Sequence, residues 1–182
     1  MNSEQERAKK AIFDFLDQNQ IPYRAFSHEK TDLPEEKLAH DAEAGIFGAT
    51  HCKNLVLANR QKTKFYLLTM ALGKRFRTGP VSRAMGSGRL NFAEDEILAR
   101  YLRTTPGMVS PLELIFDEDR VLNFFLDEDL KTADRLCFHP TDDTCTVVIE
   151  REDFYGRLLP AMGITAQFVN IPTEERESEE TQ

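Results

Sequence analysis

The stretch CKNLVLANRQKTKFYLLTMAL, residues 52–72, contains two apolar runs with the polar segment NRQKT, residues 59–63, between them. Each run has the length and composition of a buried β-strand. Two such runs joined by a short polar segment are typical of a β-hairpin. We therefore predict a hairpin over residues 52–72 whose basic turn projects into solvent.

Helix-like and strand-like patterns follow on both sides of this hairpin. Residues 4–19 repeat apolar side chains at helical spacing opposite charged ones, which predicts an amphipathic first helix. Pro160 predicts a kink or an early end in the last helix. Helices are expected at 4–19, 34–44, 80–86, 94–104 and 151–163, and further strands at 21–28, 89–93, 121–127, 134–140, 144–150 and 165–171.

The order of these elements predicts the fold class. Helices interleave with strands, several strands are linked as hairpins, and no repeat or linker divides the 182 residues. We therefore expect a single α/β domain over residues 1–172, with a mixed sheet flanked by helices. Residues 173–182 hold five Glu and one Arg, and this composition predicts an acidic, disordered tail.

The composition argues against several classes of protein. No apolar run approaches the roughly 20 residues that span a bilayer, and the first ten residues lack the apolar core of a signal peptide, so we expect a cytoplasmic protein that does not bind membranes. Three cysteines without a CxxC pair argue against a disulfide framework or a structural zinc site. The four histidines show no ligand spacing. We expect neither a metal nor another cofactor.

Charge is unevenly distributed along the chain. The net charge is −8, yet residues 53–103 contain eleven Lys and Arg against three acids, a local charge of +8. A basic region of this kind attracts phosphate groups, although a solvated face of unrelated cations gives the same count. Both interpretations remain open on charge alone.

The stretch TTPGMVSPLEL, residues 104–114, is typical of neither a helix nor a strand. Gly107 permits backbone torsions closed to other residues, and Pro111 fixes its own φ and restricts Ser110. The result is a stiff loop with accessible N–H groups, which suits a carbonyl, an ester or a phosphate. A glycine and a proline four positions apart also occur in ordinary turns.

Two further positions favour chemistry at strand ends. Lys53 opens a strongly apolar strand and has the compact charge that binds a phosphate or an ester oxygen, or it is simply a solvated strand end. His139 follows an apolar strand and precedes a turn that begins with proline. It is a candidate for binding or proton transfer, or it stabilises the turn.

In their order and separation these segments resemble the successive blocks of the YbaK/ProX family, whose members deacylate mischarged aminoacyl-tRNA. The resemblance covers about residues 21–172, and the Gly107–Pro111 loop with the upstream Lys-Asn pair is its most specific part. Length and the long first helix match the freestanding prolyl-tRNA editing branch. One block departs from the family pattern, because Thr141 stands where asparagine is common. The matching blocks are KNLVL (53–57), KFYLLTM (64–70), GRLNFAEDE (88–96), PGMVSPLEL (106–114) and CFHPTDDTCTVVI (137–149).

The resemblance implies a partly barrel-like sheet and a trans-editing hydrolase that removes alanine from the tRNA for proline. It implies catalytic roles for Lys53 at the terminal adenosine, for Gly107 in the loop at the ester, and for His139 at the amino acid side chain. The substrate-binding residues it implies are Asn54, Met108, Val109, Ser110 and Pro111. Cations that would contact the acceptor stem are Lys62, Lys64, Lys74, Arg75 and Arg77.

No nucleophile triad or carboxylate pair stands out, so we expect water to attack the ester with help from the neighbouring ribose hydroxyl and no covalent intermediate. The expected partners are the acceptor end of the tRNA for proline and, as a further candidate, prolyl-tRNA synthetase. Two alternatives stay open: a deacylase for another small amino acid such as cysteine, and a non-catalytic tRNA-binding module of the same fold.

Overall fold

The computed structural model describes residues 3–29 and 48–172. The helix predicted at 34–44 and the tail predicted at 173–182 lie outside these ranges. The strands are β1 (Arg24–Ser27), β2 (Ala49–Asn59), β3 (Phe65–Ala71), β4 (Leu90–Phe92), β5 (Leu122–Asp127), β6 (Arg135–Phe138), β7 (Cys145–Glu150) and β8 (Gln167–Val169). The helices are α1 (Ser3–Gln18), α3 (Thr78–Ala84), α4 (Asp95–Leu102), α5 (Arg151–Asp153) and α6 (Leu159–Ala161), with 3₁₀ segments η1 (Pro111–Phe116) and η2 (Glu128–Thr132) and a π segment η3 (Phe154–Leu158).

The predicted hairpin forms from β2 and β3, which run antiparallel with Val56 opposite Leu67. Its turn is exposed, as the basic composition predicts. The side-chain oxygen of Asn59 closes the turn by accepting from the N–H groups of Thr63 at 2.8 Å and Lys64 at 3.0 Å. These bonds satisfy turn amides that the strands cannot reach.

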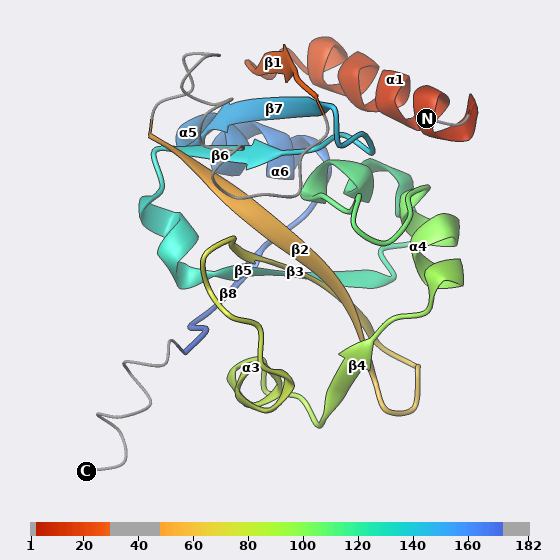
Figure 1. Cartoon of the computed structure of the whole chain (residues 1–182), viewed down its shortest axis with the longest axis vertical. Coiled ribbons are helices and arrows are strands. Elements are labelled where there is room, and N and C mark those ends of the chain that lie inside the picture. The colour runs from red at the N-terminus through yellow and green to blue at the C-terminus, as the bar shows by residue number, and fades with distance from the viewer. Residues whose placement is uncertain (1–2, 30–47, 173–182) are drawn as a thin grey trace.

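The strand β2 joins two parts of one mixed sheet, and it crosses the molecule diagonally in Figure 1. Residues 49–51 pair in parallel with β6, whereas residues 52–58 pair antiparallel with β3. The strand order is β1-β7-β6-β2-β3-β5-β8, and β4 pairs with β2 off this path. The mixed α/β single domain predicted from the sequence is thereby confirmed.

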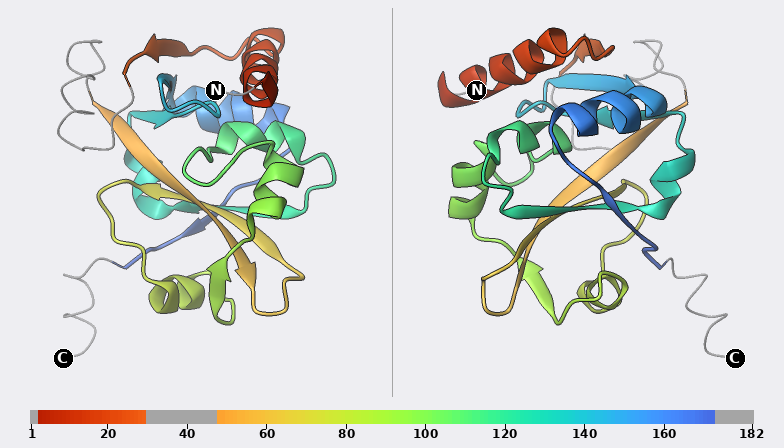
Figure 2. Two further views of the ribbon diagram at one scale, coloured as in Figure 1. Left: turned by 45° about the vertical axis from the view of Figure 1, so that its right-hand side comes forward. Right: turned by 180° about the vertical axis from the view of Figure 1, so that it is seen from behind.

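The two parts of the sheet face each other across one main core. Val56 and Leu67 from one part and Val147 and Ile149 from the other bury their side chains in the same cluster, together with Ile12 of α1. This arrangement gives the sheet its partly barrel-like form. The views in Figure 2 show α1 along one side and α5 to α6 along another.

A second core lies on the other face of the hairpin. Leu57, Leu68 and Met70 point to this face and pack against Val81 of α3. Successive residues of β2 thus alternate between the two cores, as the period of a strand requires. The α3 helix covers this face at the bottom of Figure 1.

The last helix differs from a regular α-helix in the way that Pro160 predicts. A π segment, η3, immediately precedes the turn that contains Pro160, and the helix ends at Ala161. Proline lacks the N–H that would bond back along the helix, and its ring crowds the preceding turn. Within residues 3–29 and 48–172, no helix combines the length and apolar character needed to cross a membrane.

Candidate active site

Asn54 fastens the 104–114 loop to the hairpin. Its side-chain Nδ2 donates to the carbonyl oxygen of Val109 at 2.9 Å, and its Oδ1 accepts from the hydroxyl of Thr69 at 2.7 Å. Thr69 is the residue opposite Asn54 in the β2–β3 register. The hairpin therefore fixes the orientation of the amide, and the amide fixes the loop.

Lys53 projects from the opposite face of β2. It lies opposite Met70, which belongs to the second core, whereas Asn54 faces the loop. The ammonium of Lys53 donates to the carbonyl oxygen of Lys74. Burial of the ammonium lowers the pKa of Lys53 below its ordinary value. The side chains of Lys53 and Asn54 thus lie on opposite sides of the sheet.

A pocket of about 240 Å³ lies between β2, the start of α4 and the loop. Its lining includes Asn54 and Val56 of β2, Ala93 and Asp95 at the start of α4, and Gly107 of the loop. Val109 and Pro106 also line it, so the loop contributes to the pocket as the sequence predicts. Among the described residues, neither Lys53 nor His139 lines this pocket, which differs from the expectation that both adjoin it.

Residues 105–109, which we call the open half of the loop, border the pocket. Gly107 adopts φ +87°, a left-handed conformation that a side chain disfavours. The N–H of Met108 is used within the loop, where it donates to the carbonyl oxygen of Thr105 at 3.0 Å. Within the part of the chain that the structure describes, no acceptor bonds the N–H groups of Gly107 and Val109. These two N–H groups are therefore free to donate hydrogen bonds to a ligand.

Residues 110–116, which we call the anchored half, are held by a buried carboxylate. Glu113 is 0% exposed and accepts from the N–H of Ser110, while the hydroxyl of Ser110 accepts from the N–H of Leu112 at 3.2 Å. This reciprocal arrangement is a capping box at the start of η1. Ser110 and Pro111 are both buried, so they support the loop rather than border the pocket.

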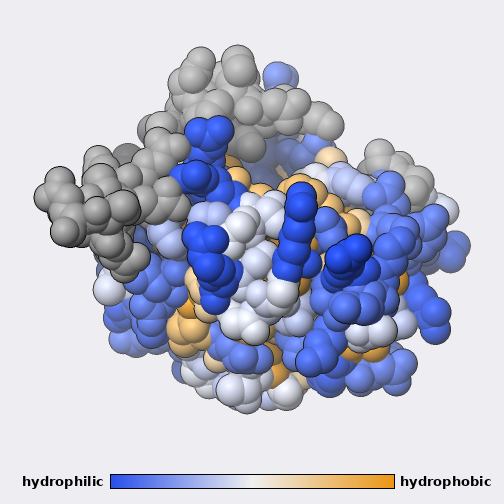
Figure 3. All heavy atoms as spheres, turned by 90° about the horizontal axis from the view of Figure 1, so that it is seen from below, coloured by the Kyte–Doolittle hydropathy of each residue, from blue (hydrophilic) through white to orange (hydrophobic). Residues whose placement is uncertain are grey.

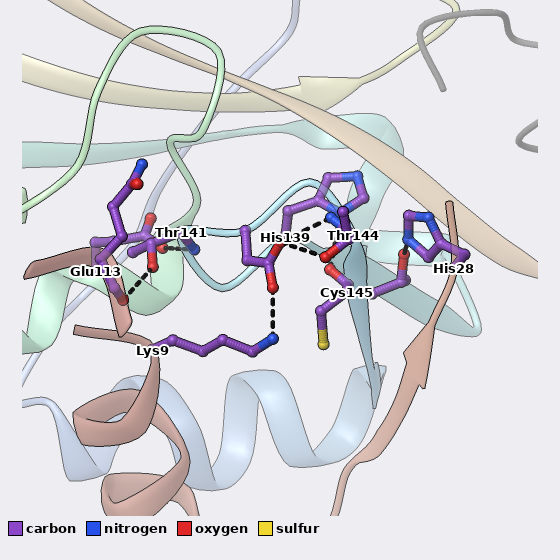
Figure 4. A network of polar contacts seen from close by, with 10 residues as sticks. Lys9, His28, Glu113, His139, Thr141, Thr144 and Cys145 are labelled. Carbon is purple, nitrogen blue, oxygen red and sulfur yellow. Dashed lines mark hydrogen bonds and ion pairs between the residues drawn. The ribbon is translucent and has the colours of Figure 1, made fainter. Parts of the chain in front are cut away.

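Glu113 also joins the loop to the turn that follows His139, as Figure 4 shows. Its second oxygen accepts from the N–H of Thr141 at 3.0 Å. Burial raises the pKa of Glu113 to about 8, although the donors from Ser110 and Thr141 act in the opposite direction. One side chain therefore holds two segments that sequence analysis treats separately.

Thr141 has an unusual backbone. It adopts φ +53°, a left-handed backbone conformation that asparagine and glycine tolerate and in which a β-branched residue is strained. Its hydroxyl donates to the carbonyl oxygen of Gln5 at 3.2 Å, a contact with α1 that offsets this strain. The departure from the family pattern thus falls at a position where the backbone, and not only the side chain, is constrained.

The rest of this turn is fixed by ion pairing and by imidazole contacts (Figure 4). Lys9 of α1 pairs with Asp142 at 2.5 Å. Burial acts to raise the pKa of Asp142, but the hydrogen bonds from Lys9 and Thr144 outweigh it and lower the pKa to about 2. His139 donates from Nδ1 to the carbonyl oxygen of Cys145 at 2.9 Å, and its ring lies 5.8 Å from that of His28.

The basic residues predicted to contact tRNA separate into two groups. Lys62, Lys64, Arg75 and Arg77 are exposed. Lys74 is not available to tRNA: it is buried, and its ammonium pairs with Asp127 at 2.8 Å and Asp129 at 2.6 Å. Lys74 therefore has a structural role, since a buried charge needs its partners. The face that carries α3, β4 and the hairpin turn is largely hydrophilic in Figure 3.

Glu113, Phe92 and Asp95 lie at this site and were not predicted from the sequence. Glu113 was detectable in principle, because Ser110 and Glu113 form the S-x-x-E pattern of a capping box. Phe92 and Asp95 line the pocket, yet nothing in the local sequence marks them. Within the described residues, no cluster of His, Cys, Asp and Glu is arranged to hold a metal ion.

This fold, with a loop that presents free amides over a small pocket, defines a class of protein. The family model of the aminoacyl-tRNA editing domain matches residues 34–155. The chain belongs to that family, and the resemblance inferred from the sequence is confirmed. The activity of the class is deacylation of aminoacyl-tRNA.

Two individual proteins are similar to this chain in sequence, and a solved structure is similar to it in fold. The chain is 28% identical over 164 residues to the prolyl-tRNA editing protein ProX of Acetoanaerobium sticklandii, covering 90% of this chain and 98% of ProX. It is 29% identical over 131 residues to the prolyl-tRNA synthetase associated domain-containing protein 1 of Mus musculus, covering 70% of this chain and 75% of that protein. A crystal structure of a candidate trans-editing enzyme for prolyl-tRNA synthetase shares the fold with a TM-score of 0.64 at 16% identity, covering 93% and 98% of the two chains.

Proposed function

We propose that this protein is a trans-editing hydrolase that removes alanine from mischarged tRNA for proline. The observation that carries the proposal is the 240 Å³ pocket, which is lined by Asn54 and by Gly107 and Val109, whose N–H groups have no acceptor among the described residues. Similarity to ProX over 90% of the chain supports the prolyl-tRNA substrate.

The proposal rests on a difference in size between two sites. A synthetase pocket that accepts proline cannot exclude alanine, because missing methylene groups cost only about 1–3 kcal/mol each. A second pocket that admits alanine and hydrolyses its ester corrects the error. Cysteine is the second candidate amino acid, since its side chain is also small.

We infer that the amides of the open half polarise the ester carbonyl as negative charge develops on its oxygen. Water attacks the carbonyl carbon, the ester C–O bond breaks, and the 3′ oxygen leaves with a proton. The adjacent ribose hydroxyl assists this step. Replacing that hydroxyl by hydrogen should abolish hydrolysis, and unchanged turnover would contradict the step.

Lys53 lies on the face of β2 away from the pocket, so it is proposed to contact the phosphate or ribose of the terminal adenosine outside the pocket and not the aminoacyl group. Its ammonium has three N–H donors, of which one is used by the carbonyl oxygen of Lys74. His139 is proposed to influence the aminoacyl site indirectly, by fixing the turn that follows it. Glu113 joins this turn to the loop that lines the pocket.

The test is deacylation of alanyl-, cysteinyl- and prolyl-tRNA, all on the tRNA for proline, by the wild type and by Lys53→Ala. We expect rapid loss of alanine alone and a decrease of about tenfold or more in the variant, since hydrogen bonds to charged groups are worth about 1.5–3 kcal/mol. Loss of cysteine instead would favour the second candidate. Binding of tRNA without any hydrolysis would replace the proposal by a binding module.

The exposed cations are proposed to guide the acceptor stem through phosphate contacts, with prolyl-tRNA synthetase as a candidate partner. Of the five cations predicted to contact tRNA, Lys62, Lys64, Arg75 and Arg77 are exposed. Each phosphate contact releases counterions, so affinity for tRNA should fall as salt rises. Affinity that is flat between about 50 and 200 mM salt would contradict this contact.

A further inference from the structure

The pocket carries a single charge on its described walls. Asp95, the first residue of α4, is exposed and lines the pocket. The other described lining residues are apolar side chains, Gly107 and the amide of Asn54. A lone carboxylate on an otherwise uncharged wall favours a ligand with a positive group.

The other polar groups of the pocket do not suit a cation. Both ends of the Asn54 amide are engaged, its Nδ2 with Val109 and its Oδ1 with Thr69. The free N–H groups of Gly107 and Val109 are donors, so they suit an oxygen. Donors and a carboxylate that line the same pocket match an α-amino ester, which has a carbonyl oxygen and an ammonium on neighbouring carbons.

The neighbouring acids differ from Asp95. Glu94 forms an ion pair with Lys62 of the hairpin turn, and neither Glu94 nor Glu96 is among the described residues of the pocket. The amino end of α4 carries a partial positive charge, which alone would repel an ammonium. The carboxylate of Asp95 carries a full negative charge at the place where the helix meets the pocket, which is larger than this partial positive charge.

We propose that Asp95 binds the α-ammonium of the aminoacyl group and thereby makes a free amino group a requirement for the substrate. The proposal rests on the proposed function of the pocket and adds to it a specificity-determining residue. Aminoacyl esters with a free ammonium bind, and those whose nitrogen is acylated bind weakly, because they offer Asp95 no charge.

The test uses two non-hydrolysable ligands and measures binding by calorimetry. In both, alanine is attached to the 3′ position of adenosine by an amide, and in one the alanine nitrogen is acetylated. The wild type should bind the free amine at least about tenfold more tightly, the ratio that a charge-assisted hydrogen bond provides. In Asp95→Asn this ratio should fall to near one, and Asp95→Glu should restore part of it.

The matched control is Glu96→Gln, which removes the same charge from the same turn of α4 outside the described pocket wall. It should retain the wild-type ratio. A ratio near one in the wild type, an unchanged ratio in Asp95→Asn, or an equal fall in Glu96→Gln would each overturn the assignment.

The same variants separate this inference from the proposed function. If alanyl-tRNA is hydrolysed while the two amides bind equally, the function stands and the role of Asp95 fails. If the free amine binds in a manner that depends on Asp95 while no aminoacyl-tRNA is hydrolysed, the ammonium site stands and the hydrolase proposal fails.

Discussion

The open and anchored halves of the 104–114 loop adjoin each other in sequence and differ in almost every physical respect. In the open half, residues 105–107 are exposed, and two amides lack an acceptor among the described residues. In the anchored half, Ser110, Pro111 and Glu113 are buried, and a capping box satisfies the start of η1. The open half faces the pocket, and the anchored half faces the core.

The difference shows how the open half of a surface loop presents fixed donors because residues outside that half hold it in place. A glycine-containing segment is flexible by itself, so its amides would not stay in one orientation. Here Asn54 holds the loop at Val109, and Glu113 holds it at Ser110, on either side of one peptide unit. A preorganised ligand-binding segment needs such support from its neighbours.

The largest effect should come from removing the anchor. Glu113→Ala leaves the N–H of Ser110 buried without an acceptor, removes one of the two acceptors of the Thr141 N–H, and opens a cavity, so we expect a loss of about 4 kcal/mol in the free energy of unfolding. Urea denaturation measures this loss. Glu118→Ala, at an exposed position of the next segment, should change the value by less than about 0.5 kcal/mol. A small loss in Glu113→Ala would show that packing and the bond from Asn54 hold the loop without Glu113.

A second effect concerns the dependence of stability on pH. The pKa of Glu113 is about 8 in the folded protein and 4.5 ordinarily, so the folded state holds a proton that the unfolded state releases between these values. The contribution to stability is full below about pH 4.5 and is lost as pH rises through about 8. Glu113→Gln cannot titrate, so the difference in unfolding free energy between wild type and variant should shift by about 3 kcal/mol from pH 5 to pH 8.

This dependence is measured by urea denaturation of both proteins across that range. Parallel stability curves for the wild type and Glu113→Gln would show that Glu113 remains ionised in the folded protein. The anchored half would then be held by hydrogen bonds to a charged carboxylate, and the two halves would differ in charge as well as in burial.

The comparison also shows which features a sequence reveals. The hairpin at 52–72 was predicted correctly because each strand contrasts sharply with its polar turn. The glycine and proline of the loop were visible for the same reason, since they act on their own backbone. Local signals of this kind are present in the residues themselves.

Features that depend on distant partners were not visible. Lys74 sits in a basic run, but it is buried by Asp127, a residue 53 positions away. Glu113 binds Thr141 across 28 positions, so only its local capping role could be inferred. The opposite directions of Lys53 and Asn54 follow from strand alternation, and that rule was available from the sequence.

The smallest effect on stability, and the sharpest test of the comparison, comes from the open half. A Cβ at Gly107 would meet no atom within 4 Å, so Gly107→Ala costs only the strain of φ +87°, about 1 kcal/mol. Gly163→Ala is the matched control, because Gly163 has φ +66° and follows α6, away from the described pocket wall. Both variants should lose similar stability in urea denaturation.

The activities of the two variants should differ. If the open half presents the amides that bind the ester, only Gly107→Ala should lose deacylation of alanyl-tRNA. The loss should affect kcat more than KM, because a shifted amide misses the developing oxyanion. Equal activities in the two variants would mean that the open half merely covers the pocket, and that the donors for the reaction lie elsewhere.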